Sequence, residues 1–279
     1  MQNAVYCLYK SHRVVNPKQP RIKTIHFCLY TLRTLLRERY DTASFLLNDN
    51  KYYSEIRNKE IVDAIYKKSG AVFITIHSNT YTLLGKIFSD HFRQRKLVVP
   101  YKAKVFRFLS KKLKKEGVIV TPLGGAMSAI QPALSNGGSV LLYLDTNLPV
   151  KHKAKVTLFG RNVELTTGPL WLAKKYNLPI VPLYIGREGK KMTVDVFQPI
   201  KYRGKKDSLV MQEISFALEN LILKNLKSWH VYDAFLLGEE EKFDMKQMVR
   251  KSVLYPLKIT PSLQKLVYLI VAFLGKAGH

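Results

Sequence analysis

His77 combines a reactive side chain with a position in the chain that suits general base catalysis. It follows Ala71–Ile76 (AVFITI), a short run rich in β-branched residues that predicts a strand buried on both faces. An imidazole at the end of such a strand, where a helix opens, can take a proton from a bound substrate. A single histidine in this place is more often a structural group, so the surrounding residues have to decide between the two roles.

Asp145 is the second candidate, because it follows another strongly apolar run, Ser139–Leu144. In a parallel sheet the functional groups gather where the strands reach their carboxyl ends, and both His77 and Asp145 fall at such ends. The alternative for Asp145 is a turn or helix-capping role, which suits the sequence Asp-Thr-Asn over residues 145–147.

Gly124 and Gly125 form a third candidate. They separate a predicted strand, Val118–Thr121, from a predicted helix, Ala126–Leu134. Backbone N–H groups at the start of a helix can bind an anion. A plain turn between a strand and a helix explains the two glycines equally well.

The elements that hold these residues alternate along the chain. Helices are predicted over Tyr53–Lys68, Phe106–Gly117, Ala126–Leu134 and Pro169–Tyr176, and strands over Ala71–Ile76, Leu97–Val99, Val118–Thr121, Ser139–Leu144, Pro179–Ile185 and Met192–Phe197. This alternation predicts an α/β fold with a mixed, largely parallel sheet flanked by helices.

Both ends of the chain are expected to add helices. The spacing of apolar residues in Ile25–Tyr40 predicts an amphipathic helix whose outer face is basic. Its inward-facing residues would be Ile25, Leu29, Leu32, Leu36 and Tyr40. Near the other end, Lys265–Gly275 has roughly ten apolar residues, whereas a membrane span takes about 20. This stretch is either a helix at a membrane surface or a helix packed on the domain. We therefore expect an N-terminal helical segment (1–68), a main α/β domain (69–235) and a tail (236–279).

Composition narrows the class of protein. The 279 residues include 47% apolar residues, which excludes a disordered chain. Two cysteines cannot build a disulfide framework or a four-cysteine zinc site, so we expect a reducing compartment and no metal or other cofactor. The start of the chain at Met1 lacks the apolar run of a signal peptide.

The charge calls for an anionic partner. Lys and Arg number 46 against 20 Asp and Glu, a net charge of +26. Nucleic acid, an anionic membrane surface and an acidic carrier protein would each balance such a charge. The sequence carries no recognisable nucleic-acid-binding motif, so we expect no nucleic acid among the partners.

Several segments resemble known enzymes. Residues 70–84 (GAVFITIHSNTYTLL) resemble the segment around the H-x4-D/E motif of lysophospholipid acyltransferases, in particular the bacterial lipid A late acyltransferases. Residues 134–185 are similar to a second block of that family, and Trp229 resembles its closing tryptophan. The matching residues of the second block are Gly138, Asp145, Phe159, Gly160, Arg161, Thr167, Gly168, Pro169, Ala173, Pro179 and Pro182.

The resemblance implies a glycerolipid acyltransferase-like fold and a direct transfer reaction. His77 would be the base that activates a hydroxyl or amine of a lipid-like or natural-product acceptor. The acyl donor would be a thioester of acyl-carrier protein or coenzyme A, and the enzyme would be peripheral on the cytoplasmic face of the inner membrane. The same resemblance implies substrate contacts for a further set of residues: Asn79, Gly124, Gly125, Arg161 and Thr167.

The chain departs from this family pattern at the motif acid. Five residues after His77, where the family has a carboxylate, stands Thr82. Three interpretations follow: Thr82 orients His77, another carboxylate replaces the acid, or catalysis is lost and only lipid or carrier binding remains. Among the carboxylates, we favour Asp145 over Asp90 and Glu164.

A second departure lies at residues 123–125. Related enzymes usually carry an arginine near the end of this strand, where it holds a phosphate or sugar substituent. This chain has Leu-Gly-Gly there, which argues against a standard phosphorylated acceptor.

Overall fold

A computed structural model describes most of the main body of the chain. The described residues are 53–229, apart from 79–80, 93–94, 102–106, 147–149, 190, 225 and 227, together with 14–15, 18, 20, 30, 33–34, 36–38 and 40–41. The predicted helix over residues 265–275 lies outside the described residues, as does Asn79. The division of the chain into three parts therefore stays a prediction.

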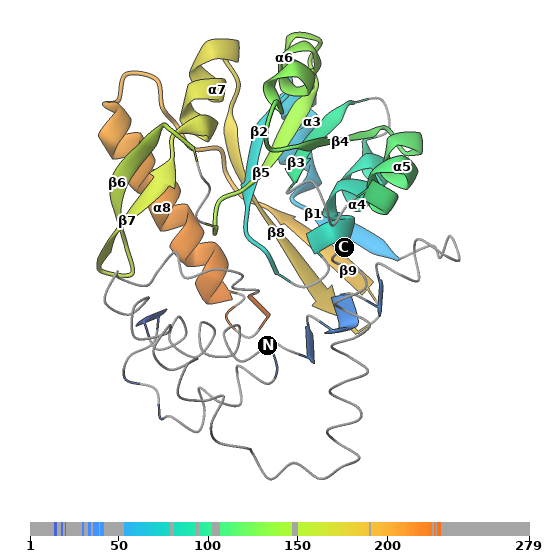
Figure 1. The fold of residues 1–279 in the computed structure, drawn as a ribbon, viewed down its shortest axis with the longest axis horizontal. Coiled ribbons are helices and arrows are strands. Elements are labelled where there is room, and N and C mark those ends of the chain that lie inside the picture. The colour runs from blue at the N-terminus through green and yellow to red at the C-terminus, as the bar shows by residue number, and fades with distance from the viewer. Residues whose placement is uncertain are drawn as a thin grey trace.

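Seven strands form one mixed sheet (Figure 1). They are β1 (Ser54–Arg57), β2 (Val72–Thr75), β3 (Leu97–Tyr101), β4 (Val118–Pro122), β5 (Ser139–Tyr143), β8 (Ile180–Glu188) and β9 (Lys191–Val196). Their order across the sheet is β1-β9-β8-β2-β5-β3-β4. The β8–β9 pair is antiparallel, and the other pairs are parallel. The predicted α/β class with a largely parallel, mixed sheet is confirmed.

Helices cover both faces of the sheet (Figure 1). One face carries α3 (Lys59–Tyr66), α4 (Leu84–His91) and α5 (Arg107–Lys115). The other carries α6 (Met127–Ser135), α7 (Gly168–Tyr176) and α8 (Asp207–Lys224). A hairpin of β6 (Lys153–Leu158) and β7 (Arg161–Thr166) packs against α8. The result is a three-layer arrangement with β2 and β5 near its centre.

The central strand β2 contributes to both halves of the core. Val72 and Ile74 point into the cluster beneath α6, α7 and α8, whereas Phe73 points into the cluster beneath α3, α4 and α5. All three side chains are fully buried. Because successive side chains of a strand alternate between faces, a strand covered on both sides needs a continuous apolar run.

The starts of β2 and β5 approach each other closely at two glycines. A Cβ atom added to Gly70 would lie 1.6 Å from the backbone oxygen of Gly138. A Cβ atom on Gly138 would lie 2.7 Å from the carbonyl oxygen of Ala133. Glycine is therefore required at residue 70 for the chain to approach Gly138, and at residue 138 for the chain to pack against the last turn of α6.

The prediction of one helix over Tyr53–Lys68 is wrong in its first part. Residues 54–57 form β1, which pairs with β9 through the register Ser54 to Met192. Asn58 has a left-handed backbone conformation (φ 54°) and separates β1 from α3. A pairing with a strand more than 130 residues away leaves no periodic signal in the local sequence.

Two further elements were not predicted from the sequence. The β6–β7 hairpin turns at Phe159 and Gly160, both with positive φ. The 18-residue helix α8 has apolar side chains on all sides, because Leu209, Phe216 and Leu223 are about half exposed opposite its buried face. Such a helix has a weak amphipathic pattern.

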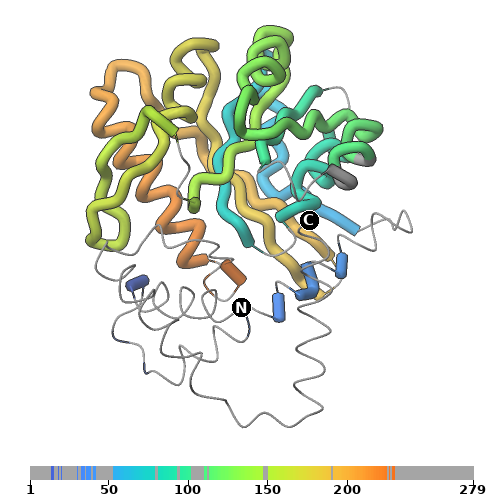
Figure 2. Tube along the Cα trace, in the orientation of Figure 1, coloured from blue at the N-terminus to red at the C-terminus, as the bar shows by residue number. Residues whose placement is uncertain are grey.

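The N-terminal segment, defined as the described residues between 30 and 41, is helical as predicted. Its predicted inward face is wrong at Leu36 and Tyr40, which are 50% and 72% exposed. The other three residues of that face, Ile25, Leu29 and Leu32, lie outside the described residues. Two acidic residues, Glu38 and Asp41, are buried instead. Asp41 forms an ion pair with Arg187 near the end of β8, and the segment accordingly lies beside the ends of β8 and β9 (Figure 2). Polar contacts, rather than apolar packing, orient these residues.

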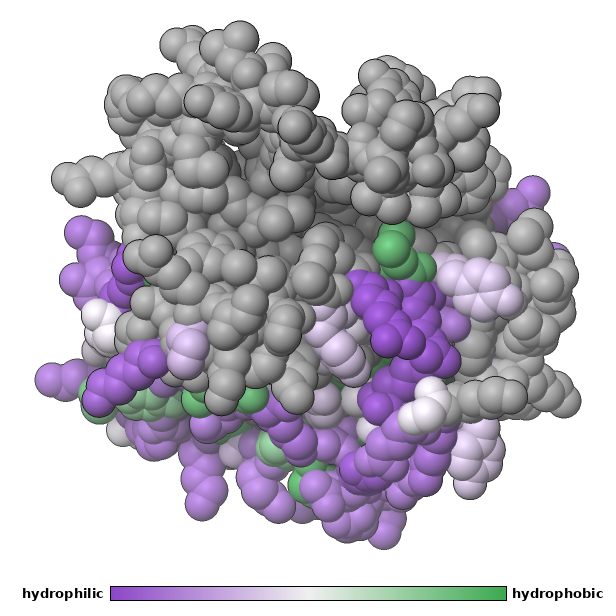
Figure 3. All heavy atoms as spheres, turned by 90° about the horizontal axis from the view of Figure 1, so that it is seen from below, coloured by the Kyte–Doolittle hydropathy of each residue, from purple (hydrophilic) through white to green (hydrophobic). Residues whose placement is uncertain are grey.

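Seen from below, the described part of the surface is predominantly hydrophilic, with hydrophobic side chains in small groups (Figure 3). Across the described residues, no helix has the length and apolar character needed to cross a membrane.

Candidate active site

The candidate site is built on the ends of two neighbouring strands. Strands β2 and β5 are parallel, and Thr75 lies opposite Tyr143 in their register. Two residues beyond this pair stand His77 and Asp145, so the ladder places them beside each other. The His77 Nδ1 atom is 2.6 Å from Asp145 Oδ1, and the His77 backbone N–H donates to Asp145 Oδ2 over 2.8 Å.

Trp229 completes the surroundings of the carboxylate. Its indole N–H donates to Asp145 Oδ2 over 2.9 Å, and both side chains are fully buried. A backbone bridge between Ser78 and Trp229 holds this segment against the residue that follows His77. Three donors thus fix the orientation of one buried carboxylate.

Two tyrosines fix the plane of the imidazole. The Tyr143 ring stacks on the His77 ring at a centroid distance of 4.6 Å, and the Tyr81 ring meets it edge-on at 4.7 Å. The Tyr143 hydroxyl donates to the backbone oxygen of Tyr81 over 2.9 Å. Burial raises the pKa of Tyr143 well above its usual value, and nearby Tyr101, Tyr81 and Asp145 raise it further. Tyr143 is therefore a neutral donor over the whole physiological pH range.

The imidazole remains within reach of solvent, because 14% of the His77 side chain is exposed. The bond to Asp145 assigns the proton of a neutral imidazole to Nδ1, and this assignment leaves the basic lone pair on Nε2. A histidine that is held by a buried carboxylate and reached by solvent can act as a general base.

Thr82 lies in the 3₁₀ turn η1 (Tyr81–Leu83) and is fully buried. Its hydroxyl donates to Glu38 Oε1 over 2.6 Å. The residue at the family's acid position is thus bonded to an acid from the N-terminal segment. The proposed orientation of His77 by Thr82 stays a prediction.

Of the three carboxylate candidates, Asp145 contacts His77. The two weaker candidates, Asp90 and Glu164, form ion pairs with lysines. Asp90 pairs with Lys86 one turn earlier on α4. Glu164, on β7, lies 3.6 Å from Lys153 Nζ on β6.

The predicted substrate contacts are spread over the molecule. Gly124 and Gly125 are exposed in the turn between β4 and α6, where Gly125 has a φ of 82°. Strand β4 lies three positions from β2 in the sheet, which corresponds to about 14 Å. Arg161 opens β7 after the hairpin turn. The substrate contacts of the two glycines and of Arg161 stay predictions.

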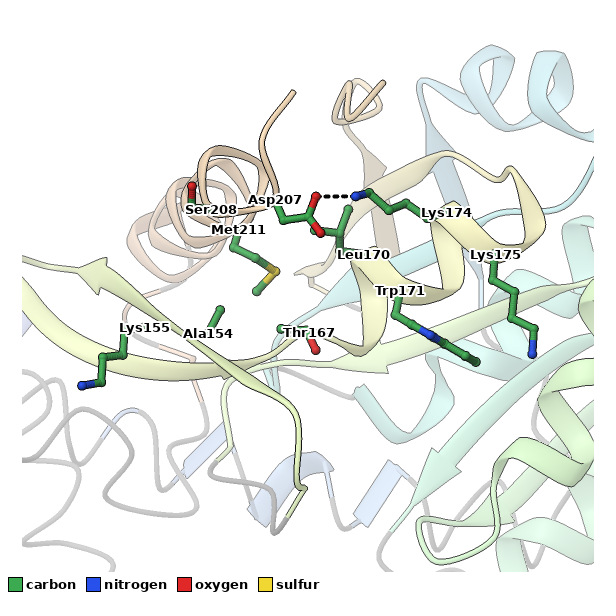
Figure 4. A pocket seen from close by; sticks show the side chains of 10 residues that line it. All are labelled: Ala154, Lys155, Thr167, Leu170, Trp171, Lys174, Lys175, Asp207, Ser208 and Met211. Atoms are coloured by element: carbon green, nitrogen blue, oxygen red, sulfur yellow. Dashed lines mark hydrogen bonds and ion pairs between the residues drawn. The ribbon is translucent and has the colours of Figure 1, made fainter. Parts of the chain in front are cut away.

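Thr167 lies in a separate pocket of about 730 Å³ (Figure 4). Its side chain and that of Trp171 come from the start of α7, Ala154 comes from β6, and Met211 comes from α8. The Lys174–Asp207 ion pair spans two of these elements. The lining residues of this pocket include neither His77 nor Asp145.

Sequence reasoning missed several residues of the site. Tyr81, Tyr143 and Glu38 were not considered, and Trp229 was noted as a family match without a role. For Tyr143, the signal was its place at the end of the strand that leads to Asp145. Within the described ranges, no group of three His, Cys, Asp or Glu side chains is placed to hold a metal ion.

Comparison with known proteins identifies a family. No curated protein matches the chain. The family described as bacterial lipid A biosynthesis acyltransferase matches residues 37–233, well over half of the chain. The matched range includes His77, Thr82, Asp145 and Trp229. On this match, the chain belongs to the bacterial lipid A biosynthesis acyltransferase family.

Proposed function

We propose that the protein transfers a fatty acyl group from a thioester of acyl-carrier protein or coenzyme A to a hydroxyl or amine of a lipid-like or natural-product acceptor. Family membership supports lipid acyl transfer as the type of reaction. The observation that carries the proposed mechanism is the 2.6 Å contact between His77 Nδ1 and the buried Asp145 carboxylate.

In the proposed reaction, His77 Nε2 takes the proton of the acceptor hydroxyl or amine. The acceptor atom attacks the thioester carbonyl carbon, and a new C–O or C–N bond forms as the C–S bond breaks. The imidazolium then returns its proton to the leaving thiolate. Asp145 stays ionised, holds the Nδ1 proton and stabilises the imidazolium, as the acid does in other acid–histidine pairs.

In this proposal, Asp145 orients the imidazole and stabilises its positive charge. A hydroxyl at Thr82 supplies no negative charge, whereas Asp145 supplies one directly at Nδ1. The altered motif is therefore compatible with turnover in this proposal.

The partners follow from charge and chemistry. A net charge of +26 suits an acidic carrier protein and an anionic membrane surface, where each Lys or Arg contributes about 1 kcal/mol. We place the enzyme peripherally on the cytoplasmic face of the inner membrane, where donor and lipid-like acceptor meet.

The second candidate function is a binding protein without turnover. Thr82 in place of the motif acid favours it, because loss of general acid–base catalysis costs about 10²–10⁴-fold in rate. Such a protein would bind lipid or acyl carrier and release no acylated product.

The deciding experiment measures acyl transfer by the full chain on anionic vesicles, with labelled acyl-carrier protein and acyl-coenzyme A as parallel donors. Acceptors are found by mass spectrometry of lipids from cells with and without the gene. His77→Ala is expected to abolish transfer, and Asp145→Asn to lower kcat by about 10²–10⁴-fold, while vesicle binding is retained.

The matched control is His152→Ala, because His152 is an exposed histidine outside the site. It is expected to leave transfer unchanged. Unchanged turnover in His77→Ala would remove His77 from the mechanism. The absence of any acylated product from the wild-type chain with either donor would favour the binding protein.

A further inference from the structure

Glu38 is a buried carboxylate that the reaction steps above do not use. Its side chain is fully buried, although it belongs to the N-terminal segment, where Leu36 and Tyr40 are exposed. Its Oε1 atom accepts a hydrogen bond from the Thr82 hydroxyl over 2.6 Å. Burying a carboxylate is costly unless hydrogen bonds or a nearby cation compensate it. The burial of Glu38 therefore needs a reason.

Thr82 connects Glu38 to the candidate site. It stands five residues after His77, in the turn η1 whose first residue is Tyr81. The Tyr81 ring packs edge-on against the His77 imidazole. A hydrogen bond to Thr82 thus anchors the turn that carries one wall of the imidazole site.

The carboxylate also acts on the tyrosines around the imidazole. Burial raises the pKa of Tyr101, and the neighbouring Tyr81 and Glu38 raise it further. The Tyr101 ring lies 6.1 Å from the ring of Tyr143, which stacks on His77. The field of Glu38 therefore reaches the aromatic cluster that encloses the imidazole.

We propose that Glu38 is a positioning residue of the site, which supplies through Thr82 the negative charge that the family carries five residues after the histidine. This proposal rests on the proposed function. In it, Asp145 holds Nδ1 of the imidazole directly, while Glu38 fixes the turn after His77 and stabilises the imidazolium from a second side. In this proposal, the negative charge of the motif comes from Glu38 in the N-terminal segment instead of from residue 82 in the turn η1.

The first test is Glu38→Gln, which keeps the shape and removes the charge. Acyl transfer is expected to fall roughly tenfold in kcat with little change in KM, because the charge matters most when the imidazolium forms. The acidic limb of the rate profile is expected to move to lower pH, since an imidazole without this neighbouring charge keeps its proton less well. A purely structural role would lower stability without moving the limb.

The second test exchanges the two residues. In Glu38→Thr with Thr82→Glu, the carboxylate returns to the family position and the hydroxyl moves to the helix. The double variant is expected to recover most of the kcat lost in Glu38→Gln. Where Glu38→Gln fails to fold, Thr82→Val is used instead, because it breaks the same hydrogen bond. Its kcat, KM and pH profile are then measured in the same way.

Asp41→Asn is the matched control. Asp41 is a second buried acid of the same segment, but its partner is Arg187 on β8. This variant is expected to lower the melting temperature and to leave the pH profile of transfer unchanged. A shift of the profile in Asp41→Asn as large as that in Glu38→Gln would assign the effect to loosening of the segment and overturn the proposal.

An NMR titration of the His77 imidazole separates this proposal from the proposed function, because it needs no substrate. Its midpoint is expected at lower pH in Glu38→Gln than in wild type. An unchanged midpoint, or an exchange variant that stays as slow as Glu38→Gln, refutes the role of Glu38. If the midpoint shifts but the wild-type chain has no transferase activity, the proposed reaction is wrong, whereas the influence of Glu38 on the His77 imidazole is supported.

Discussion

At the residue scale, the site depends on how firmly one carboxylate is held. Asp145 has a histidine side chain, a histidine backbone N–H and an indole N–H around it, within 2.6–2.9 Å. A carboxylate fixed in this way keeps the imidazole in one orientation without having to reorganise during the reaction. Trp229 is the donor that comes from farthest away in the sequence.

Trp229→Phe is the variant that isolates this donor. We expect a roughly tenfold lower kcat with KM little changed, since Phe keeps an aromatic ring at this position but loses the N–H to Asp145. The smaller ring also leaves a cavity at this fully buried site, which lowers the melting temperature without a comparable effect on KM. The chain has two tryptophans, and the half-exposed Trp171 provides the control as Trp171→Phe. Equal losses of transfer in both variants would contradict the role of the indole N–H.

At the element scale, the pairing of β2 with β5 positions His77 beside Asp145. Just before these two strands, the backbones of Gly70 and Gly138 are in close contact. Strand pairing and site geometry therefore depend on the same short segment of backbone, and a change that separates the strand starts disturbs both.

Gly70→Ala is expected to lower the free energy of unfolding by about 3 kcal/mol or more, because the new methyl group would overlap the Gly138 carbonyl. Urea denaturation measures the loss. Gly124→Ala is the matched control, since no atom lies within 4 Å of its added Cβ, and a change within about 0.5 kcal/mol is expected. A Gly70→Ala variant as stable as this control would show that the strand starts can separate freely.

At the scale of the whole molecule, strong basicity is combined with an interior rich in tyrosine. Burial raises the pKa of Tyr66, Tyr101 and Tyr143 above the value of about 10 that tyrosine has in the unfolded chain. Below pH 10 these phenols are neutral in both states. Above it the unfolded chain releases protons that the folded chain retains.

Stability is therefore expected to fall as the pH rises above about 10, by up to about 1.4 kcal/mol per pH unit for each tyrosine. Melting temperatures between pH 8 and 11.5 measure the fall. Tyr101→Phe removes one of the three buried phenols and should make the melting temperature fall less steeply with pH. Tyr40→Phe is the control and should leave the slope unchanged, because Tyr40 is exposed. A curve that Tyr101→Phe leaves unchanged would contradict this assignment.

Much of the fold was predictable because its signals are local. Each buried parallel strand appears as a short apolar run, and β2, β3, β4, β5 and β8 fall where those runs are. By contrast, β1 depends on a distant partner strand, and α8 has too weak an amphipathic pattern to be recognised.

The residues of the candidate site likewise divide into those with a local sequence signal and those without one. His77 and Asp145 were predictable because both stand directly after apolar strands. Glu38 was not, because an acidic residue in a basic, exposed-looking helix gives no local sign that it is buried. Its partner Thr82 could be recognised only as a departure from a motif.

The register that sets Thr75 against Tyr143 has a consequence for the variation of this protein over evolutionary time. His77 and Asp145 stand at the same level, two residues beyond this pair, so the contact between them depends on the strand register and not on the length or composition of the connecting loops. The stretch just after the histidine is likewise released from providing its own acid. Substitutions in that stretch can therefore accumulate while the contact between His77 and Asp145 is kept.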